Sequence, residues 1–317
     1  MKILLITNNF DYPISDFIKY LLVNKIEFIR DNGNSIYNER YFNLSLSNDQ
    51  MIVNYYPGYN IYVRKSPVPN MDIYNEFGLD IVRHITSEIK QLKQDIFRIL
   101  VNNPRIKVFG SNNFGLNDIS KIDVLINAKK IGLNIPETII TTSAARFKEF
   151  VKKYTKVVSK PIVNPVFIKD FRSNVTFNMY TEVLTENNMP LFESKSIFPS
   201  LVQNYIEKLF EIRVYIIGKK FYPMAIFSQF NTKTQFDFRN HDNQNPNKIV
   251  PYKLSYKIKL KLLRLMKLYN MNNASIDLIY SPDNILYFLE INPFGQFNFY
   301  TKCCNYFVEK EITSYFA

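Results

Sequence analysis

Three side chains in the last fifth of the chain have the types and spacing of ligands for a hard cation. Asp277 lies in one apolar run, and Glu290 and Asn292 lie in the next. Carboxylate and amide oxygens are ligands that Mg2+ prefers, and a carboxylate is costly to bury unless it is paired or bound to a cation. The sequence therefore offers a candidate magnesium site. The alternative is that both carboxylates face water on the exposed side of a half-buried sheet.

A β-hairpin must position these ligands. Two apolar runs, Ser275–Tyr280 and Ile285–Ile291, flank the turn residues Ser281–Asn284. Side chains two apart on a strand share a face, so the carboxylate and the amide of the second run point the same way. A loop of two or four residues also puts Asp277 on that face. The Asn-Pro pair that follows ends the strand at its polar side chains, which favours the cation site.

Length and composition indicate a globular protein with more than one core. The chain has 317 residues, of which 46% are hydrophobic and 21% charged. No apolar run is long enough to span a bilayer, and the start, MKILLITN, lacks a signal-peptide cleavage site, so we expect a cytoplasmic protein. The two cysteines, Cys303 and Cys304, are adjacent and offer no disulfide framework.

The net charge of +12 comes from scattered Lys and Arg residues without a long basic arm. Basic proteins often bind nucleic acid or anionic surfaces. The scatter favours a milder interpretation, which is affinity for an acidic small substrate or peptide.

The start of the chain predicts a small α/β domain. Lys2–Thr7 is typical of a strand buried on both faces, Ile14–Lys25 of a helix, and Ile26–Arg30 of a second strand. The loop after the first strand has no glycine, so a dinucleotide-binding fingerprint is absent.

Later patterns alternate between helices and strands. Changes in local residue pattern along the chain predict domains at 1–107, 108–199 and 200–317. Further predicted helices cover Ile81–Val101, Lys121–Ile131, Ala144–Lys153 and Tyr256–Tyr269. Further predicted strands cover Tyr59–Arg64, Thr138–Thr141, Val157–Lys160, Thr176–Thr185, Leu201–Ile206, Phe210–Ile217 and Phe221–Gln229.

Four segments carry a resemblance to a known family: FEIRVYIIGKKFYPMAIFSQ, TQFDFRN, PNKIVPYKL and IDLIYSPDNILYFLEINPFGQF. They resemble the ATP-grasp superfamily of carboxylate ligases. The resemblance is closer still to the ligases that macrocyclise ribosomal peptides, the microviridin-type graspetide enzymes and their grasp-with-spasm relatives. It extends over nearly the whole chain. It implies an α/β (α+β) ATP-grasp fold with an N-terminal pre-ATP-grasp domain, a central lobe and a C-terminal lobe, and with ATP between two antiparallel sheets.

The resemblance also implies roles for basic residues at matching positions. Lys121 and Lys160 match the lysines that contact nucleotide phosphates, where the alternative is an ordinary exposed lysine. Arg213 and Arg239 match arginines that face the triphosphate and the acyl phosphate, since a guanidinium fork suits phosphate oxygens. Surface salt bridges are the alternative for both arginines.

The hinge and the metal set complete the implied site. In the family the hinge backbone contacts the adenine, and a following glutamate is a candidate for the ribose hydroxyls. The matching hinge residues here are Gln203, Asn204, Tyr205, Ile206 and Glu207. The matching magnesium ligands are Asp277, Glu290 and Asn292. One departure is that Pro161–Phe177, where many relatives have a glycine-rich phosphate loop, contains no glycine.

The implied function is ATP- and Mg2+-dependent activation of Asp or Glu side chains in a ribosomal precursor peptide. Attack by a Ser or Thr hydroxyl, or by a Lys amine, then closes an ester or amide ring. The partners implied are the leader and core of that precursor and a second copy in a homodimer, with no nucleic acid and no membrane. One alternative is a carboxylate–amine ligase that adds an amino acid to a small molecule or protein tail. A more distant alternative is a non-catalytic basic protein that binds nucleic acid.

Overall fold

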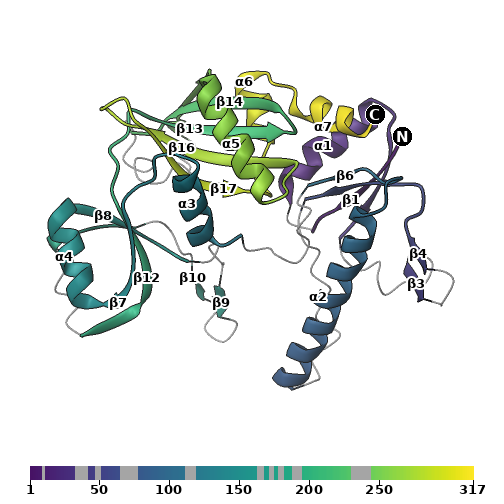
Figure 1. Ribbon diagram of the computed structural model, residues 1–317. Coiled ribbons are helices and arrows are strands. Elements are labelled where there is room, and N and C mark those ends of the chain that lie inside the picture. The colour runs from purple at the N-terminus through teal and green to yellow at the C-terminus, as the bar shows by residue number, and fades with distance from the viewer. Residues whose placement is uncertain are drawn as a thin grey trace.

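The computed structural model describes residues 1–8, 11–32, 42–46, 51–64, 78–110, 119–162, 168–170, 175–177, 182–187, 195–229 and 244–317. The described segments form an N-terminal α/β unit, a central lobe and a C-terminal lobe (Figure 1). The N-terminal unit lies against the C-terminal lobe, whereas the central lobe extends away from both (Figure 1).

The N-terminal unit is built on a parallel sheet with the strand order β2-β1-β5-β6. Every residue of β1 except Lys2 is buried, as expected for an apolar strand covered on both faces. Because β1 and β5 are parallel neighbours, their carboxyl ends meet at one edge of the sheet. The elements are β1 (Lys2–Ile6), α1 (Tyr12–Val23), β2 (Glu27–Asp31), β5 (Asn60–Val63), α2 (Leu79–Val101) and β6 (Val108–Phe109), and β3 (Phe42–Leu46) pairs with β4 (Met51–Tyr55) in a separate hairpin.

The central lobe is built on an antiparallel sheet with the order β11-β8-β12-β7. Helix α4 packs on this sheet through a small apolar core that includes Phe147, Val151 and Val202. The elements are β7 (Thr138–Ser143), α4 (Ala144–Tyr154), β8 (Lys156–Lys160), β11 (Glu182–Thr185) and β12 (Ser196–Asn204), and β9 (Ile168–Asp170) pairs with β10 (Val175–Phe177) in a separate sheet.

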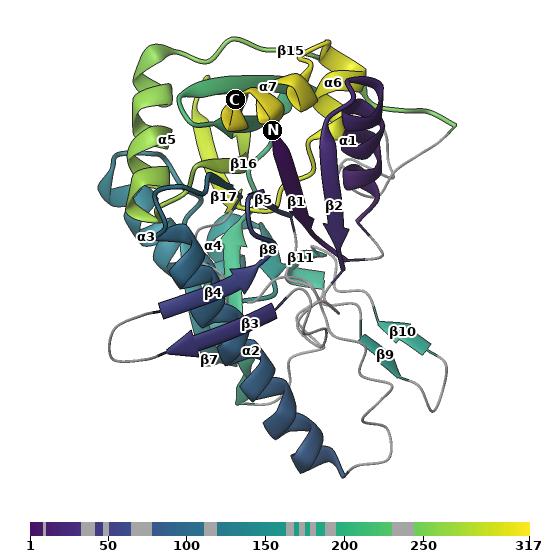
Figure 2. The same cartoon turned by 90° about the vertical axis from the view of Figure 1, so that its right-hand side faces the viewer.

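The C-terminal lobe is built on a five-stranded antiparallel sheet with the order β15-β14-β13-β16-β17. One face packs on α3 and α5, through buried residues such as Val124 and Leu262. The other face packs on α6, α7 and the N-terminal unit, as Figure 2 shows for α1 and α7. The elements are α3 (Lys121–Lys130), β13 (Phe210–Ile217), β14 (Lys220–Phe227), β15 (Lys248–Pro251), α5 (Tyr256–Leu268), β16 (Asn273–Tyr280), β17 (Leu286–Asn292), α6 (Asn298–Cys304) and α7 (Val308–Phe316).

The hydrophobic cores show which parts of the chain share buried apolar side chains. One core joins β1 and α1 to the C-terminal sheet and to α6 and α7, and it contains Phe17, Tyr62, Tyr215 and Phe297. The core under α4 is separate from it. The N-terminal unit and the C-terminal lobe therefore share one packed interior, and the central lobe has an interior of its own.

The predicted α/β class and the order of the longer elements are confirmed. The expected strand over Thr176–Thr185 is wrong in extent: among its described residues, Glu182–Thr185 pairs with β8, whereas Thr176 and Phe177 belong to the β9–β10 pair. Strand β12 runs through residue 200 and pairs with β7 and β8, so the boundary expected there divides a strand of the central lobe. No described helix is long and apolar enough to cross a membrane.

Candidate active site

The hairpin of β16 and β17 places the predicted metal ligands on one face of the C-terminal sheet. Asp277 is directly opposite Glu290, and Ser275 is directly opposite Asn292. Directly opposite residues of an antiparallel pair share a face. The three side chains that the sequence singled out are therefore brought to one end of one hairpin.

The strand pairing that gives this register contains a shift that the sequence did not predict. Tyr280 pairs with Leu286, so residues 281–285 form a five-residue connection. With that connection alone, Asp277 would oppose Leu289, and Glu290 would point to the other face. The register shifts by one between Asp277 and Leu278, and this β-bulge at Leu289 returns Glu290 to the face of Asp277. The expected loop of two or four residues is wrong, although the shared face is as predicted.

Arg213 extends this polar face onto β13. It is directly opposite Asp277, and its Nε lies 3.2 Å from Asp277 Oδ1. The same Nε–H donates to Ser275 Oγ at 3.0 Å, and Ser275 Oγ lies 3.3 Å from the Tyr300 hydroxyl. Both side chains of the ion pair are mostly buried, with 12% of Arg213 and 15% of Asp277 exposed. Burial raises the pKa of the Tyr300 phenol well above its ordinary value, so Tyr300 is protonated at neutral pH. The guanidinium is thus held in one orientation beside the carboxylate.

The Asn-Pro turn after β17 is fixed by its own hydrogen bonds and by close packing. Asn292 Oδ1 accepts from the Phe294 amide at 2.9 Å. Gly295 packs so tightly on Ser275 that a Cβ at this glycine would lie 2.0 Å from Ser275 Cβ. The glycine is needed for close approach of the turn to the strand that carries Asp277.

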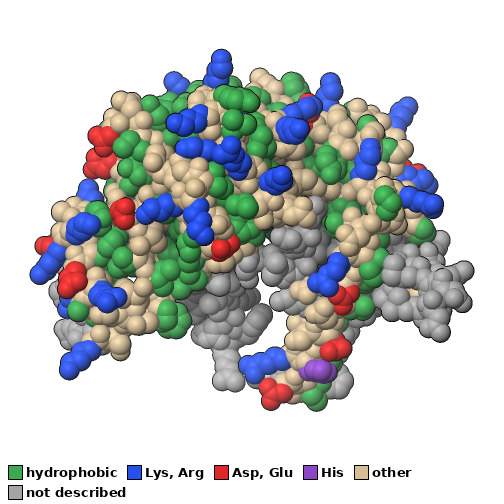
Figure 3. All heavy atoms as spheres, in the orientation of Figure 1, with side chains coloured by type: hydrophobic (Ala, Val, Ile, Leu, Met, Phe, Trp, Pro, Cys, Tyr) green, Lys and Arg blue, Asp and Glu red, His purple; other side chains and the backbone are tan. Residues whose placement is uncertain are grey.

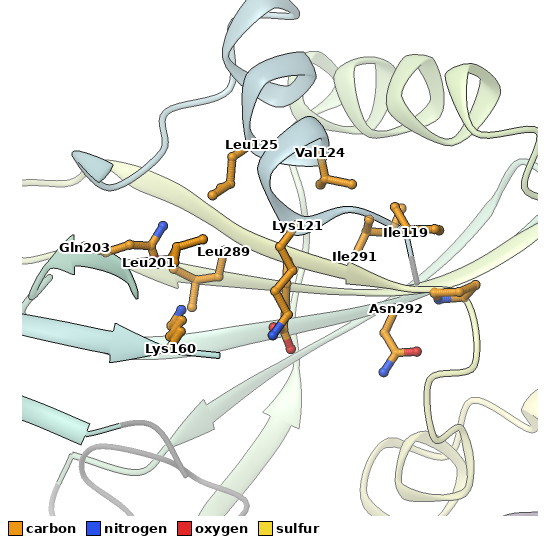
Figure 4. Close-up of a pocket in the computed structure, with 12 residues that line it drawn as sticks. Ile119, Lys121, Val124, Leu125, Lys160, Leu201, Gln203, Leu289, Ile291 and Asn292 are labelled. Atoms are coloured by element: carbon orange, nitrogen blue, oxygen red, sulfur yellow. The ribbon is translucent and has the colours of Figure 1, made fainter. Parts of the chain in front are cut away.

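A pocket lies between the two antiparallel sheets and under α3. The pocket opens to solvent, and its space including that opening is about 610 Å³. Figure 4 shows Lys121 extending from α3 into this pocket, between Lys160 on one side and Asn292 on the other. The lining residues are Ile119, Lys121, Val124, Leu125, Lys160, Leu201, Gln203, Leu289, Glu290, Ile291, Asn292 and Pro293.

The two predicted phosphate lysines come together in this pocket. Lys121 is the first residue of α3, whose N-cap is Ser120 Oγ accepting from the Asp123 amide at 3.2 Å. Lys121 Nζ donates to the carbonyl oxygen of Pro161 at 3.0 Å, directly after Lys160 at the end of β8. Neither lysine is fully exposed. Two cations thus reach one cavity from a helix N-terminus and a strand end.

The predicted hinge connects the two lobes. Gln203 is buried, lines the pocket and donates through Nε2 to Thr138 Oγ1 at 3.1 Å. The backbone amides of Asn204 and Tyr205 donate to the carbonyl oxygens of Glu137 and Lys156, each at 3.0 Å. These bonds fix the hinge backbone at the end of β12, between β7 and β8. Glu207, the last residue of the predicted hinge, is exposed.

The donor set fits a magnesium ion that completes its coordination with ligand oxygens. Among the described residues, no three His, Cys, Asp or Glu side chains gather as a metal-binding group. Two facing carboxylates with a neighbouring amide are too few for an all-protein cage. Mg2+ is ordinarily bound in this way, by one or two carboxylates together with substrate phosphates.

The structure leaves some predicted residues untested and adds others. Arg239 lies outside the described residues, as does most of the glycine-free stretch 161–177. The sequence interpretation missed Ser275, which accepts a hydrogen bond from Arg213, and Tyr300, whose hydroxyl contacts Ser275. Strand periodicity could have indicated Ser275, two residues before Asp277 on the same face. Tyr300 lies on α6 and reaches the site only through tertiary packing.

Comparison with known proteins gives the fold. No protein-family model and no curated protein matches the chain. Among solved structures, the chain is similar to an RiPP-associated ATP-grasp ligase of Chryseobacterium gregarium bound to ADP and a leader and core peptide. The TM-score is 0.78 at 24% identity, over 99% of this chain and 94% of that one. It is also similar to the macrocyclase MdnC of Microcystis aeruginosa MRC bound to its precursor peptide MdnA, with a TM-score of 0.76 at 22% identity over 99% and 98% of the two chains.

A more distant similarity is to the ATP-bound D-alanine–D-alanine ligase of Bacillus anthracis. There the TM-score is 0.53 at 16% identity, over 93% of this chain and 87% of that one. The protein therefore has the ATP-grasp fold, as the sequence resemblance implied. Of the three structures, the first contains a bound leader and core peptide and the second the bound precursor peptide MdnA.

Proposed function

We propose that this protein is an ATP-dependent peptide macrocyclase of the graspetide type. The observation that carries the proposal is the pocket between the two sheets. It places two lysines and the buried hinge glutamine opposite a carboxylate and an amide of the metal hairpin. The likeness to structures of ligases bound to ADP and precursor peptides, over 99% of the chain, supports the same reaction class.

Within this proposal each side of the pocket holds one part of the nucleotide. Lys121 and Lys160 bind phosphate oxygens as compact positive charges. The amides of Asn204 and Tyr205 already donate to neighbouring strands. We therefore assign the hydrogen bond to the adenine edge to the backbone of Ile206, and contact with the ribose hydroxyls to Glu207.

The hairpin and Arg213 hold the reacting end. Asp277, Glu290 and Asn292 would bind Mg2+, which neutralises phosphate charge when it is present. Arg213 stabilises the negative charge that develops on the transferring phosphoryl group, with its guanidinium already oriented by Asp277 and Ser275. We assign the same role toward the acyl phosphate to Arg239.

The proposed substrate is an Asp or Glu side chain of a precursor peptide. Its carboxylate attacks the γ-phosphorus of ATP and forms an acyl phosphate with release of ADP. A Ser or Thr hydroxyl, or a Lys amine, of the same peptide then attacks the acyl carbon, loses its proton and releases inorganic phosphate. Closure of the central lobe over the pocket would exclude water that could hydrolyse the acyl phosphate.

The test is incubation of the protein with ATP, Mg2+ and a candidate precursor peptide encoded nearby, followed by mass spectrometry. We expect the peptide to lose one water mass per ring, with ADP formed in proportion. Lability of the new bond to base distinguishes an ester from an amide. Asp277→Ala, which removes a proposed magnesium ligand, is the inactive control. A peptide of unchanged mass while ATP is consumed in its presence would contradict macrocyclisation.

The same experiment separates the alternatives. Addition of a free amino acid to the peptide would indicate a carboxylate–amine ligase instead. A nucleic-acid binder would show no ATP turnover and an affinity that falls steeply with added salt. On the face drawn in Figure 3, Lys and Arg are dispersed among hydrophobic and neutral side chains, which does not favour that alternative. A homodimer and cytoplasmic residence stay predictions from the sequence.

A further inference from the structure

Arg64 is a buried cation that joins the N-terminal unit to the turn after the metal hairpin. It follows β5 at the carboxyl edge of the parallel sheet, and only 1% of the residue is exposed. Its Nη1 donates to two consecutive carbonyl oxygens of the turn, Phe294 O at 2.9 Å and Gly295 O at 2.7 Å. The sequence predicts that Arg64 ends a strand but does not indicate that its side chain is buried.

Asp11 fixes the other side of the same guanidinium. Arg64 Nε donates to Asp11 Oδ2 and Arg64 Nη2 donates to Asp11 Oδ1, both at 3.2 Å. The Thr7 hydroxyl donates to Asp11 Oδ2 at 2.8 Å, so the carboxylate is itself held in place. Because Thr7 and Asp11 follow β1, they lie at the same sheet edge as Arg64. A buried charge costs several kcal/mol unless it is paired and hydrogen-bonded. Arg64 is paired with Asp11, and four of its five guanidinium N–H groups donate the hydrogen bonds described above.

The two carbonyls that Arg64 binds belong to the turn that directly follows the proposed ligand Asn292. The Asn292 side chain accepts from the amide of Phe294, and the Gly295 amide donates to the Asn292 carbonyl at 3.3 Å. Phe294 and Gly295 thus each donate through the backbone amide to Asn292 and each accept from Arg64 through the carbonyl oxygen. Movement of the guanidinium would move the Asn292 amide with it.

Apolar contacts fasten the same turn to the N-terminal unit. Phe294 packs against the core of β1 and β5. The Phe297 ring lies 5.5 Å from the Arg64 guanidinium carbon and makes an edge contact with Phe17 of α1 at 6.3 Å. The turn at the end of the metal hairpin therefore packs against the N-terminal unit.

We propose that Arg64, oriented by Asp11, is a positioning residue for the cation site, so that the affinity of that site for Mg2+ depends on the N-terminal unit. The inference rests on the proposed function, which places Mg2+ at Asp277, Glu290 and Asn292. The competing explanation is that the ion pair contributes only to global stability. The two explanations differ in whether metal affinity and thermal stability change together.

The test measures metal-dependent ADP binding, which needs no turnover. The purified full chain is titrated with a fluorescent ADP analogue at a series of Mn2+ or Mg2+ concentrations, and the unfolding temperature is measured in parallel. Arg64→Lys keeps the charge but loses the planar fork. We expect it to raise the half-saturating metal concentration by about 10-fold or more, as is usual when the support of a metal ligand is removed.

Tyr315→Phe is the matched control for interface stability. Its hydroxyl donates to Val108 O at 3.1 Å and accepts from Asn272 Nδ2 at 3.2 Å, so it also joins the N-terminal unit to the C-terminal lobe. Its hydrogen bonds and its ring contacts with Phe109 and Phe316 involve residues outside the turn of Asn292. We expect a lower unfolding temperature in this variant with a wild-type metal titration.

Thr7→Val, which removes one hydrogen bond to Asp11, gives a milder variant should Arg64→Lys fail to fold. We expect a smaller shift in the same direction. A wild-type metal titration in a folded Arg64→Lys or Thr7→Val variant overturns the inference, as does an equal shift in Tyr315→Phe. Absence of metal-dependent ADP binding in the unsubstituted protein would overturn the proposed function itself, which makes the two failures distinguishable.

Discussion

Asp277 and Glu290 lie directly opposite each other on β16 and β17, although the five-residue connection between these strands would by itself turn them to opposite faces. The bulge at Leu289 corrects the register by one residue. The facing carboxylates therefore depend on two irregularities that compensate each other. Bulges recur near functional sites because they re-aim single side chains.

Removal of either carboxylate should abolish nucleotide chemistry without unfolding the protein. We expect Asp277→Ala and Glu290→Ala each to lower ATP turnover by about 100-fold or more, the size typical for loss of a group that stabilises transition-state charge. Glu290 lines the pocket, so its removal should change the unfolding temperature little. Asp277→Ala leaves the mostly buried Arg213 guanidinium without its carboxylate, so this variant should unfold at a lower temperature while still folding. Asp283→Ala, in the exposed turn of the same hairpin, is the control. Unchanged turnover in both test variants would rule out the metal assignment.

Arg213 should tolerate lysine poorly. Its Nε both pairs with Asp277 and donates to Ser275, and a lysine ammonium cannot keep this orientation while reaching a phosphate. We expect Arg213→Lys to lower kcat by about 10- to 100-fold, with a smaller change in KM for ATP. Arg98→Lys makes the same substitution at an exposed ion pair on α2 and should leave both constants unchanged. A larger effect on KM than on kcat would instead indicate a role in ground-state binding.

Gly295 should not accept even a methyl group. A Cβ there would lie 2.0 Å from Ser275 Cβ, so either the turn or β16 must move. We expect Gly295→Ala to lower the free energy of unfolding by about 1–3 kcal/mol, as overpacking usually does, and to weaken metal-dependent ADP binding. Gly78→Ala, where the added Cβ meets open space, is the comparison. Denaturant unfolding and the ADP titration measure the two effects, and wild-type behaviour in Gly295→Ala would show that the turn adapts.

Tyr269 should make the attachment of α3 sensitive to alkaline pH. Its hydroxyl donates to Asp123 Oδ2 at 2.5 Å and accepts from Asn127 Nδ2 at 2.8 Å, both on the helix that carries Lys121. Burial, followed by the bond to Asp123, raises the pKa of Tyr269 from 10.0 to about 12. The phenol therefore ionises first in the unfolded chain. Its stabilising contribution is complete below pH 10 and is lost as the pH rises from 10 to about 12.

We expect Tyr269→Phe to lower the free energy of unfolding by about 1 kcal/mol at pH 8 and to reduce its fall above pH 10. Urea unfolding at several pH values measures both quantities. Tyr256→Phe, at an exposed tyrosine that begins α5, the helix capped at its C-terminus by Tyr269, should change neither. An alkaline fall as steep in Tyr269→Phe as in the unsubstituted protein would assign that fall to other buried tyrosines.

Much of the architecture could be predicted because local patterns determine it. The continuous apolar run of β1 requires a strand covered on both faces, and the helical spacing of α3, α4 and α5 gives their positions within a few residues. The acidic and amide residues of the hairpin could be singled out because oxygen ligands next to a strand end are unusual in an apolar context. The family resemblance then ordered these parts into an ATP-grasp fold.

Other features depend on contacts between distant segments, which local patterns do not contain. The sequence predicts only that Arg64 is a cation at the end of a strand. In the structure it is buried, because residues 294–297 pack on the N-terminal unit. Tyr300 reaches Ser275 only because α6 packs on the C-terminal sheet. The sequence by itself singled out candidate residues for phosphate and metal binding. The tertiary structure decided their register and support, because the bulge and the hydrogen bonds from Arg64 to the turn of the C-terminal lobe arise from packing across the chain and not from residue spacing.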